Sequence, residues 1–315
     1  MSTPVYDEGH VQLYTGDARQ TLAEFPPGSV DCVVTSPPYW RKRDYGHPDQ
    51  YGLETTFTDY VENLRTVFAE IDRVLTGQGT VWLNLGDSYI TNAPGPRTNP
   101  GTLRGPSNAR TMPRGFGDKG GMAKKNLAGI PWRVAFALQT DGWILRSAIV
   151  WHKPNAMPES VADRPAMRHE MLFLLVKQGR YFFDLDPVRE PHAESSHQRS
   201  RRNRHTVNRA TRAIHTPHTL DPEQACHPRG RNPGDVWTMG TRPSRHEHYA
   251  SFPLELPRRC IAAGCPEDGT VLDPFSGSGT TLVAARQVGR SAIGIDLNPD
   301  YHDIAISRLA REART

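Results

Sequence analysis

A glycine-rich loop between a short apolar run and a helical pattern is the feature that most constrains the fold of this chain. The loop reads Asp-Pro-Phe-Ser-Gly-Ser-Gly-Thr-Thr at residues 273–281. Its glycines let the backbone turn tightly, and a helix that begins at Thr280 offers N–H groups that have no partner within the helix. Asp296 lies 23 residues after Asp273, at the end of the next predicted strand, where a carboxylate can hold the hydroxyls of a ribose. The pattern predicts a strand-loop-helix-strand unit that binds a nucleoside cofactor.

The same loop argues against a dinucleotide. A dinucleotide-binding loop carries a third glycine, and here Leu282 occupies that position. Asp273 and Phe275 also stand where a pyrophosphate would favour bare backbone. Nicotinamide chemistry is therefore the less favoured alternative, and a tight turn without any ligand is the structural alternative for a lone Gly-x-Gly.

Predicted strands and helices alternate along all 315 residues. Such alternation is typical of an α/β fold with a mostly parallel sheet covered by helices on both faces, and the chain is long enough for one large core. The strands are predicted at 11–15, 30–35, 80–85, 144–151, 171–176, 271–272 and 292–295, and the helices at 57–75, 127–139, 254–263, from 280 and from 300.

A second motif, Ser36-Pro37-Pro38-Tyr39, follows the predicted strand at 30–35. Two consecutive prolines stiffen the backbone and remove two N–H donors, so that carbonyl oxygens stand beside a hydroxyl and an aromatic ring. Such a site can accept both hydrogens of an amino group at the Ser36 Oγ and the Pro37 carbonyl, while Tyr39 stacks on the attached heterocycle. The structural alternative is a turn that ends the strand, with a packed tyrosine.

Positive charge is concentrated in two irregular segments. Residues 92–126 contain seven Lys and Arg against one acidic residue, and residues 189–231 contain nine Arg against four acidic residues. The net charge of the whole chain is only +4, so the remainder is acidic. Clustered Lys and Arg are what a nucleic-acid backbone requires, and arginine suits phosphates and guanine edges. Solvated or disordered loops are the alternative interpretation.

Several classes of protein are disfavoured by composition. The four cysteines (Cys32, Cys226, Cys260 and Cys265) form no disulfide framework, which predicts a reduced, cytoplasmic protein. No apolar run approaches the roughly 20 residues of a membrane helix, and the amino terminus shows no targeting pattern. The histidines near Cys226 match no closed set of zinc ligands, so no metal site is predicted.

Together, the two motifs resemble those of the amino-methyltransferases of DNA. The Ser-Pro-Pro-Tyr motif precedes the glycine-rich loop, with a basic segment between them, and this order resembles the permuted beta subgroup. The resemblance implies a Rossmann-like fold dependent on S-adenosyl-L-methionine. The domains it implies are 1–91 (catalytic half), 92–126 (basic loop), 127–188 (remainder of the sheet), 189–245 (target-recognition insertion) and 246–315 (cofactor half).

The resemblance also implies the reaction. Serine at the first motif position is commoner among N4-cytosine enzymes than among N6-adenine enzymes, which favours N4 of cytosine over N6 of adenine. Transfer would be direct, because no cysteine lies in either motif. The target base must leave the double-stranded DNA, and Tyr39 would receive it. A methyltransferase acting on RNA and a catalytically silent nucleic-acid-binding module remain the rival classes.

The resemblance assigns roles residue by residue. Asp17 would approach the adenine of the cofactor, although a turn or helix cap is nearly as well supported for Asp17 and Asp87. The segments 152–154 and 169–170 are expected to be structural or to contact the nucleic-acid backbone. A cognate restriction endonuclease is an expected partner, with a monomer or homodimer as the functional state. The catalytic residues are predicted to be Ser36, Pro37, Pro38 and Tyr39; the cofactor residues Asp17, Phe252, Asp273, Phe275, Ser276, Gly277, Gly279, Thr280, Thr281 and Asp296; and the DNA-binding residues Arg110, Arg114, Lys124, Lys125, Arg199, Arg201, Arg202 and Arg204.

Overall fold

The computed structural model describes residues 3–90, 122–195, 227–241 and 252–312. The chain divides into two compact units. The first comprises Met1–Phe183 and Asp235–Thr315, and the second comprises Asp184–Gly234.

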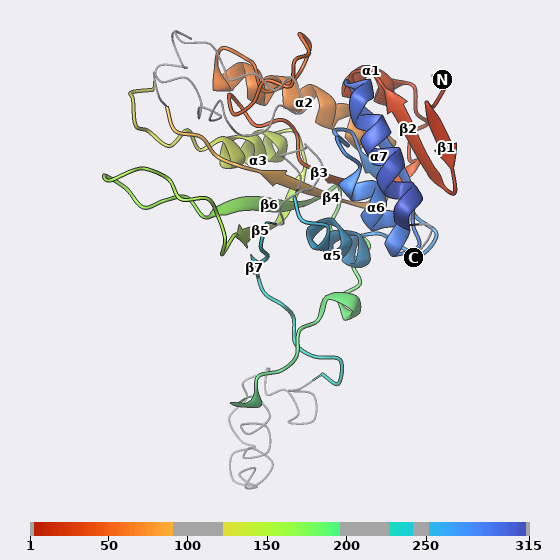
Figure 1. Ribbon diagram of the computed structural model, residues 1–315. Coiled ribbons are helices and arrows are strands. Elements are labelled where there is room, and N and C mark those ends of the chain that lie inside the picture. The colour runs from red at the N-terminus through yellow and green to blue at the C-terminus, as the bar shows by residue number, and fades with distance from the viewer. Residues whose placement is uncertain (1–2, 91–121, 196–226, 242–251, 313–315) are drawn as a thin grey trace, which may run out of the picture. The chain divides into compact units, whose positions relative to one another are not determined.

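One mixed sheet forms the centre of the first unit (Figure 1). Its strand order within the described residues is β1-β2-β9-β8-β3-β4-β6-β5-β7. Neighbours are parallel from β2 to β4 and between β5 and β7, whereas β1 and β6 run antiparallel to their neighbours. The strands are β1 (Tyr6–Glu8), β2 (Val11–Thr15), β3 (Val30–Thr35), β4 (Leu75–Leu85), β5 (Ile144–His152), β6 (His169–Val176), β7 (Val236–Thr238), β8 (Thr270–Asp273) and β9 (Ser291–Asp296).

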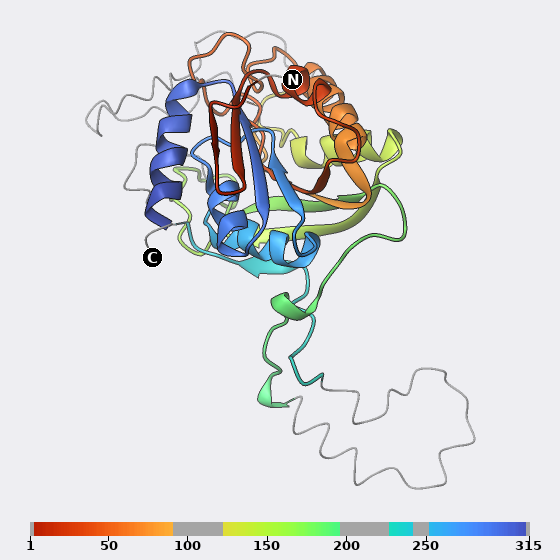
Figure 2. The same ribbon diagram turned by 90° about the vertical axis from the view of Figure 1, so that its right-hand side faces the viewer.

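Helices cover both faces of this sheet (Figures 1 and 2). The first face carries α1 (Ala18–Ala23), α2 (Phe57–Val74) and α3 (Ile130–Thr140), and the second carries α5 (Glu255–Gly264), α6 (Thr280–Gln287) and α7 (Pro299–Glu312). The apolar stripe of α2, which includes Tyr60, Leu64 and Phe68, is fully buried. Burial of such a stripe is what stabilises an amphipathic helix against a sheet.

The order of the strands creates a switch point at the carboxyl ends of two central strands, β3 and β8. The chain passes from β3 through α2 to β4 in one direction, and from β8 through α6 to β9 in the other, while β3 and β8 lie side by side and parallel. Ligands of open α/β sheets bind at such a switch point, outside the carboxyl ends of the strands. Both predicted motifs begin at this point, because residues 36–39 follow β3 and the loop at 273–281 follows β8.

The structure adds elements that the sequence patterns did not predict. Helix α1 and strands β1 and β7 are new, and β4 begins at Leu75 rather than at residue 80. None of the helices in the described part of the chain combines the length and the apolar character needed to cross a bilayer.

The second unit is held by pairs of arginine and acidic side chains. Arg189 and Arg229 both pair with Asp186, with nitrogen-oxygen distances of 2.7 Å in each case. Arg231 pairs with Glu190 at 3.0 Å, and these two residues also form an isolated β-bridge. Some of the arginines that make this segment basic therefore already have acidic partners.

Candidate active site

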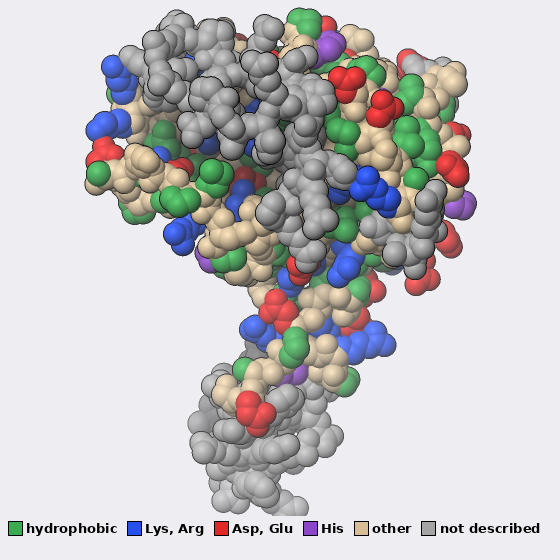
Figure 3. Space-filling view, in the orientation of Figure 1, with side chains coloured by type: hydrophobic (Ala, Val, Ile, Leu, Met, Phe, Trp, Pro, Cys, Tyr) green, Lys and Arg blue, Asp and Glu red, His purple; other side chains and the backbone are tan. Residues whose placement is uncertain are grey.

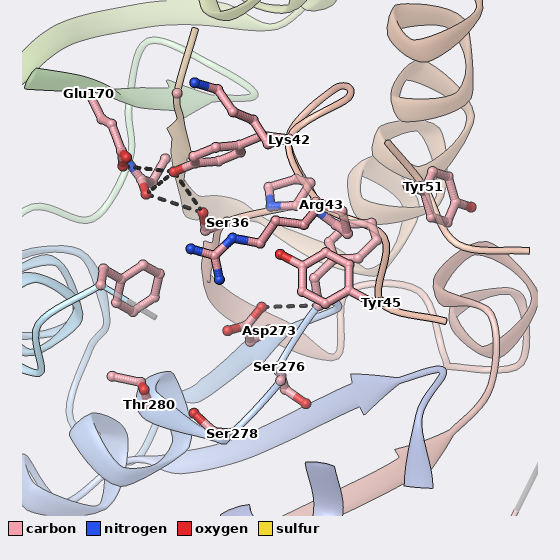
Figure 4. Close-up of a pocket in the computed structure, with 18 of the residues that line it drawn as sticks. Ser36, Lys42, Arg43, Tyr45, Tyr51, Glu170, Asp273, Ser276, Ser278 and Thr280 are labelled. Carbon is pink, nitrogen blue, oxygen red and sulfur yellow. Dashed lines mark hydrogen bonds between the residues drawn. The ribbon is translucent and has the colours of Figure 1, made fainter. Parts of the chain in front are cut away.

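The two motifs line one cavity of about 820 Å³ within the first unit. Figure 4 shows Ser36 and Glu170 on one side of this pocket and Asp273, Ser276, Ser278 and Thr280 on the other. Arg43 extends into the gap between Ser36 and Asp273. The pocket is therefore formed jointly by the ends of β3 and β8, as expected for a switch point.

The Ser-Pro-Pro-Tyr segment (residues 36–39) is held by a polar side chain of the neighbouring strand. In the parallel register Thr35 pairs with Leu83, so Ser36 comes beside Asn84. The Ser36 Oγ lies 3.1 Å from the Asn84 Oδ1 and 3.2 Å from the Tyr39 Oη. The Asn84 amide nitrogen donates to the Met171 carbonyl at 3.1 Å, so its Oδ1 must act as an acceptor.

Glu170 extends this network. It lies at the start of antiparallel strand β6, whose residues Met171 and Leu172 pair with Leu85 and Asn84 of β4. The Tyr39 hydroxyl donates to the Glu170 Oε2 at 2.7 Å, and the Lys153 ammonium pairs with the Glu170 Oε1. Burial and the Glu170 carboxylate raise the pKa of Tyr39 well above its usual value, so the phenol keeps its proton.

The direction of these hydrogen bonds leaves Ser36 as an acceptor. Its single proton is used either on the Asn84 Oδ1 or on the Tyr39 Oη, because the Tyr39 proton goes to the stronger carboxylate acceptor. The Ser36 oxygen can then accept a hydrogen from a donor group in the pocket. An amino group fits this site, whereas a carbonyl oxygen does not.

The prolines differ from each other in their surroundings. The Pro38 carbonyl accepts a hydrogen bond from the Tyr60 hydroxyl at 2.9 Å, whereas no such bond to the Pro37 carbonyl occurs within the described residues. The Tyr39 ring lies against Gly86, where an added Cβ would stand 2.5 Å from the ring. A glycine is therefore required beside the tyrosine, and the Pro37 carbonyl is available to a ligand.

The glycine-rich loop (residues 273–281) is fixed by Asp273, which is 3% exposed. Its carboxylate accepts hydrogen bonds from the Thr35 hydroxyl at 2.7 Å and the Thr281 hydroxyl at 2.6 Å. The Phe275 backbone N–H also donates to it, at 3.1 Å. Burial nevertheless raises the pKa of Asp273 to about 6. Asp273 thus ties β3 to the start of α6 as well as lining the pocket.

Asp296 holds the centre of the same loop. Its Oδ2 accepts from the Gly277 backbone N–H at 2.8 Å, and its Oδ1 accepts from the Asn298 N–H at 2.9 Å. Burial raises the pKa of this carboxyl to about 6. The buried Ser276 Oγ has no hydrogen-bond partner within the described residues, so the pocket offers an unsatisfied polar group to a ligand.

Not every predicted cofactor residue faces the pocket. Phe252, Phe275, Gly277 and Thr280 line it, together with Ser276, Asp273 and Asp296. Thr281 is fully buried outside the lining and supports Asp273 instead. Gly279 also lies outside the lining; it adopts a φ of 73° at the start of α6, where an added Cβ would stand 2.7 Å from the Ala305 Cβ. Both residues shape the loop from behind.

Two aspartates act as helix caps. The Asp17 Oδ1 accepts from the Gln20 N–H of α1 at 3.0 Å, and its Oδ2 accepts from the Tyr51 hydroxyl at 3.0 Å. Asp17 is not among the residues that line the pocket, although its neighbours Gly16 and Ala18 are, and its carboxylate caps α1. Asp87 accepts from the Ile130 N–H at the start of α3 at 3.0 Å and also lines the pocket.

The sequence patterns missed several residues of the pocket wall. The segments with Lys153 and Glu170 were expected to be structural or to contact the nucleic-acid backbone, and the structure places both residues in the network of Tyr39. The segment after residue 39 supplies Lys42, Arg43, Tyr45 and Tyr51, and the Tyr51 ring packs edge-on against Phe275 at 5.3 Å. Burial lowers the pKa of Lys42. A signal was present in the sequence, since Lys, Arg and Tyr cluster directly after the motif.

Most of the predicted DNA-binding residues lie outside the described residues. These are Arg110, Arg114, Arg199, Arg201, Arg202 and Arg204. Lys124 and Lys125 are described and exposed, and the Lys125 ammonium pairs with Asp163 at 2.6 Å. Figure 3 shows Lys and Arg side chains distributed over one face of the molecule.

Known proteins share both the sequence and the fold of this chain. The model of the N6/N4 methyltransferase family, described as DNA methylase, matches residues 30–307. The type II methyltransferase M.Cfr9I of Citrobacter freundii is 44% identical over 304 residues, which are 95% of this chain and 88% of that protein. The type II methyltransferase M.SmaI of Serratia marcescens is 38% identical, over 95% of this chain and 91% of that protein.

Solved structures match over nearly the whole chain. The PvuII DNA methyltransferase (cytosine-N4-specific) superposes with a TM-score of 0.65 at 18% identity, covering 97% of this chain and 88% of that one. A DNA modification methylase of Thermus thermophilus, complexed with S-adenosyl-L-methionine, superposes with a TM-score of 0.54 at 26% identity, covering 95% and 93%. The mostly parallel sheet with helices on both faces is therefore confirmed.

Proposed function

Because the chain belongs to the N6/N4 DNA methylase family, we propose that it moves a methyl group from S-adenosyl-L-methionine to N4 of a cytosine in double-stranded DNA. The observation that carries this proposal is the pair of acceptors at Ser36 and Pro37, which faces the glycine-rich loop across one pocket. The name of the PvuII enzyme and the serine at the first motif position support cytosine over adenine.

The side of the pocket formed by the glycine-rich loop suits the cofactor. Ser276 offers an unsatisfied hydroxyl, Asp296 offers a carboxylate for the ribose, and Phe252 and Phe275 offer apolar surface. The Thermus relative was solved with S-adenosyl-L-methionine, which supports the same cofactor here. When bound, the cofactor supplies an electrophilic methyl group on a positively charged sulfur. The two carboxylates Asp273 and Asp296 would favour that positive charge.

The side of the pocket formed by the Ser-Pro-Pro-Tyr segment suits an amino group. The lone pair of a cytosine amino nitrogen is delocalised into the ring, so the nitrogen is a poor nucleophile. Acceptance of its two hydrogens by the Ser36 oxygen and the Pro37 carbonyl returns electron density to nitrogen and aims the lone pair across the pocket. The methyl group would pass from sulfur to nitrogen, the electrons of the broken carbon–sulfur bond would stay on sulfur as a neutral thioether, and nitrogen would give up one of its protons to water. Much of the rate enhancement would come from holding nitrogen and methyl carbon in line. Tyr39, fixed by Gly86 and Glu170, stacks on the extruded base.

The relatives M.Cfr9I and M.SmaI are named type II methyltransferases. We extend this to a partner: the chain would protect the recognition site of a cognate restriction endonuclease. Its predicted basic insertion, residues 189–245, would read that site.

The test uses DNA from cells that express the chain or its Ser36→Ala variant. The DNA is digested to nucleosides and analysed by mass spectrometry, and the modified site is mapped by sequencing. The proposal predicts N4-methylcytosine with the wild-type chain and none with the variant. N6-methyladenine would overturn the choice of base, and the absence of both marks in DNA would overturn DNA as the substrate.

A further inference from the structure

The loop between β5 and β6, residues 153–168, carries an unusually exposed apolar side chain. Met157 is 88% exposed, and the next most exposed large hydrophobic residue within the described residues, Val236, is 59% exposed. Figure 1 shows this β5–β6 loop projecting away from the sheet, and Figure 3 shows hydrophobic side chains on the same side of the molecule. A single exposed apolar side chain is ordinary on a protein surface, so the position of Met157 matters more than its exposure.

Met157 also stands at the rim of the pocket. It lines the cavity together with Ala156 and Glu159, and the same cavity contains Ser36 and Tyr39. Its side chain is both exposed and part of the lining, so Met157 lies at the mouth of this cavity.

The backbone around Met157 is held firmly. Pro154 and Pro158 stand on either side of it in the sequence. Asn155 donates to the Thr241 carbonyl at 2.6 Å and accepts from the Thr241 N–H at 2.9 Å. The Lys153 N–H donates to the Arg168 carbonyl at 2.8 Å and closes the base of the loop. A side chain on such a support can be pushed into a neighbouring molecule without the loop collapsing.

The far side of the loop is braced as well. The Glu159 carboxylate accepts from Arg164 at 2.6 Å and from the Met167 N–H at 3.3 Å. The Arg164 guanidinium in turn lies 3.8 Å from the centre of the Tyr89 ring. Both arms of the loop are therefore anchored to the body of the first unit, while Met157 itself is exposed.

From these observations we propose that Met157 is a wedge, which enters the DNA stack and fills the space left by the extruded base. Other proteins that kink DNA insert apolar side chains, methionine among them, between base steps, and the added contacts offset the cost of unstacking. The proposal rests on the proposed function, because it requires a double-stranded DNA substrate whose target base leaves the helix.

The test compares Met157→Ala with Val161→Ala, a matched control in the same loop that is 38% exposed and does not line the pocket. The probes are two synthetic duplexes with the site mapped in cells. One keeps the target cytosine and reports methyl transfer, and the other carries 2-aminopurine at the target position, whose fluorescence rises when it unstacks. Met157→Ala is expected to lower the fluorescence rise and to lower kcat/KM by about tenfold, since unstacking costs a few kcal/mol per step. Val161→Ala should stay within about twofold of the wild type, as expected for a surface change.

A further duplex, with an abasic site opposite the target cytosine, separates a wedge from a merely structural role. When an abasic site stands opposite the target, less work is needed to extrude the base, so the defect of Met157→Ala should shrink to about twofold. A loss of kcat/KM in Met157→Ala that is equal on the abasic and the fully paired cytosine duplex would overturn the wedge. Full activity of Met157→Ala on the fully paired duplex would overturn it as well. If the wild-type chain neither raises the fluorescence nor methylates the duplex, the proposed function fails first and the wedge fails with it.

Discussion

The glycine-rich loop after β8 and the Ser-Pro-Pro-Tyr segment after β3 face each other across one pocket, but they are held in different ways. Two buried carboxylates fix the glycine-rich loop: Asp273 bonds to Phe275 and Thr281 within the loop and to Thr35 at the end of β3, and Asp296 at the end of β9 holds Gly277. The Ser-Pro-Pro-Tyr segment instead depends on residues far along the chain, namely Asn84, Lys153 and Glu170.

This difference indicates a division of labour. A loop fixed by two buried carboxylates can present a constant surface to a cofactor. A segment fixed by side chains of β4 and β6 can place a hydroxyl and a ring against a base only when those strands are paired. Changes on one side should therefore alter cofactor binding, and changes on the other should alter turnover.

The largest loss of stability and of cofactor affinity is expected from Asp273→Ala. The change removes the acceptor of three hydrogen bonds, leaves the buried Thr35 hydroxyl without this acceptor, and leaves the Thr281 hydroxyl with only the Val34 carbonyl at 3.2 Å. The free energy of unfolding should fall by about 3 kcal/mol, and the affinity for S-adenosyl-L-methionine should fall by about 100-fold. Urea unfolding and titration calorimetry measure the two quantities. The Thr281→Val control removes one donor and should cost only about 1 kcal/mol; unchanged cofactor affinity in Asp273→Ala would contradict the assigned role.

Glu170→Gln tests the role of the Ser-Pro-Pro-Tyr segment in turnover. The side chain keeps its size but loses the charge that accepts from Tyr39 and pairs with Lys153. We expect kcat to fall by about 10- to 100-fold, as for loss of a positioned charged group, with cofactor affinity within about twofold. Glu62→Gln is the control, because Glu62 also pairs with an arginine, Arg65, but does not line the pocket. A joint loss of kcat and cofactor affinity would break the proposed separation.

The pH dependence should come from the cofactor side. The pKa of Asp273 and that of Asp296 are both raised to about 6 from 3.8. Between these values the folded protein binds more protons than the unfolded chain, so stability falls as the pH rises from about 4 to about 6 and then levels off. Each carboxyl contributes about 3 kcal/mol to this fall, as an upper figure. Affinity for the cationic cofactor should rise over the same range, and Asp273→Asn should flatten both profiles; stability that increases from pH 4 to 6 would contradict this account.

The smallest effect is expected on the salt dependence of DNA binding, from the exposed lysines Lys124 and Lys125. Lys124→Ala should reduce the slope of log affinity for DNA against log salt by about 0.9 if its ammonium contacts a phosphate. Lys125→Ala should change it less, because the Lys125 ammonium already pairs with Asp163. Fluorescence anisotropy at several salt concentrations measures both slopes. Equal slopes for the two variants would remove this distinction.

The same contrast explains what the sequence could predict. Residues that act through local contacts were found: the loop at 273–281 lies between β8 and α6 as expected, and residues 36–39 follow β3. Asp17 was assigned to the adenine of the cofactor with a cap as a nearly equal alternative, because a helix cap and a ligand contact share the same turn signature. The position of Glu170 and Lys153 beside Tyr39 could not be predicted, because only the antiparallel pairing of β6 with β4 and β5 brings them there.

Short elements were missed for a similar reason. Strand β7 has three residues and is defined by its pairing with β5. Helix α1 has six residues and depends on its Asp17 cap. Neither is long enough to show a period in the sequence, so tertiary contacts rather than local pattern determine them.

The most direct test of the central claim compares cofactor affinity and turnover in Ser36→Ala. Ser36 accepts the amino hydrogen in this account but takes no part in the glycine-rich loop. Titration calorimetry should give a Kd for S-adenosyl-L-methionine within about twofold of the wild type, while methyl transfer to DNA should fall by about 100- to 1,000-fold, as for loss of one positioned hydrogen-bonding group in a transition state. Turnover that survives the change, or a Kd that rises together with the loss of turnover, would contradict the account.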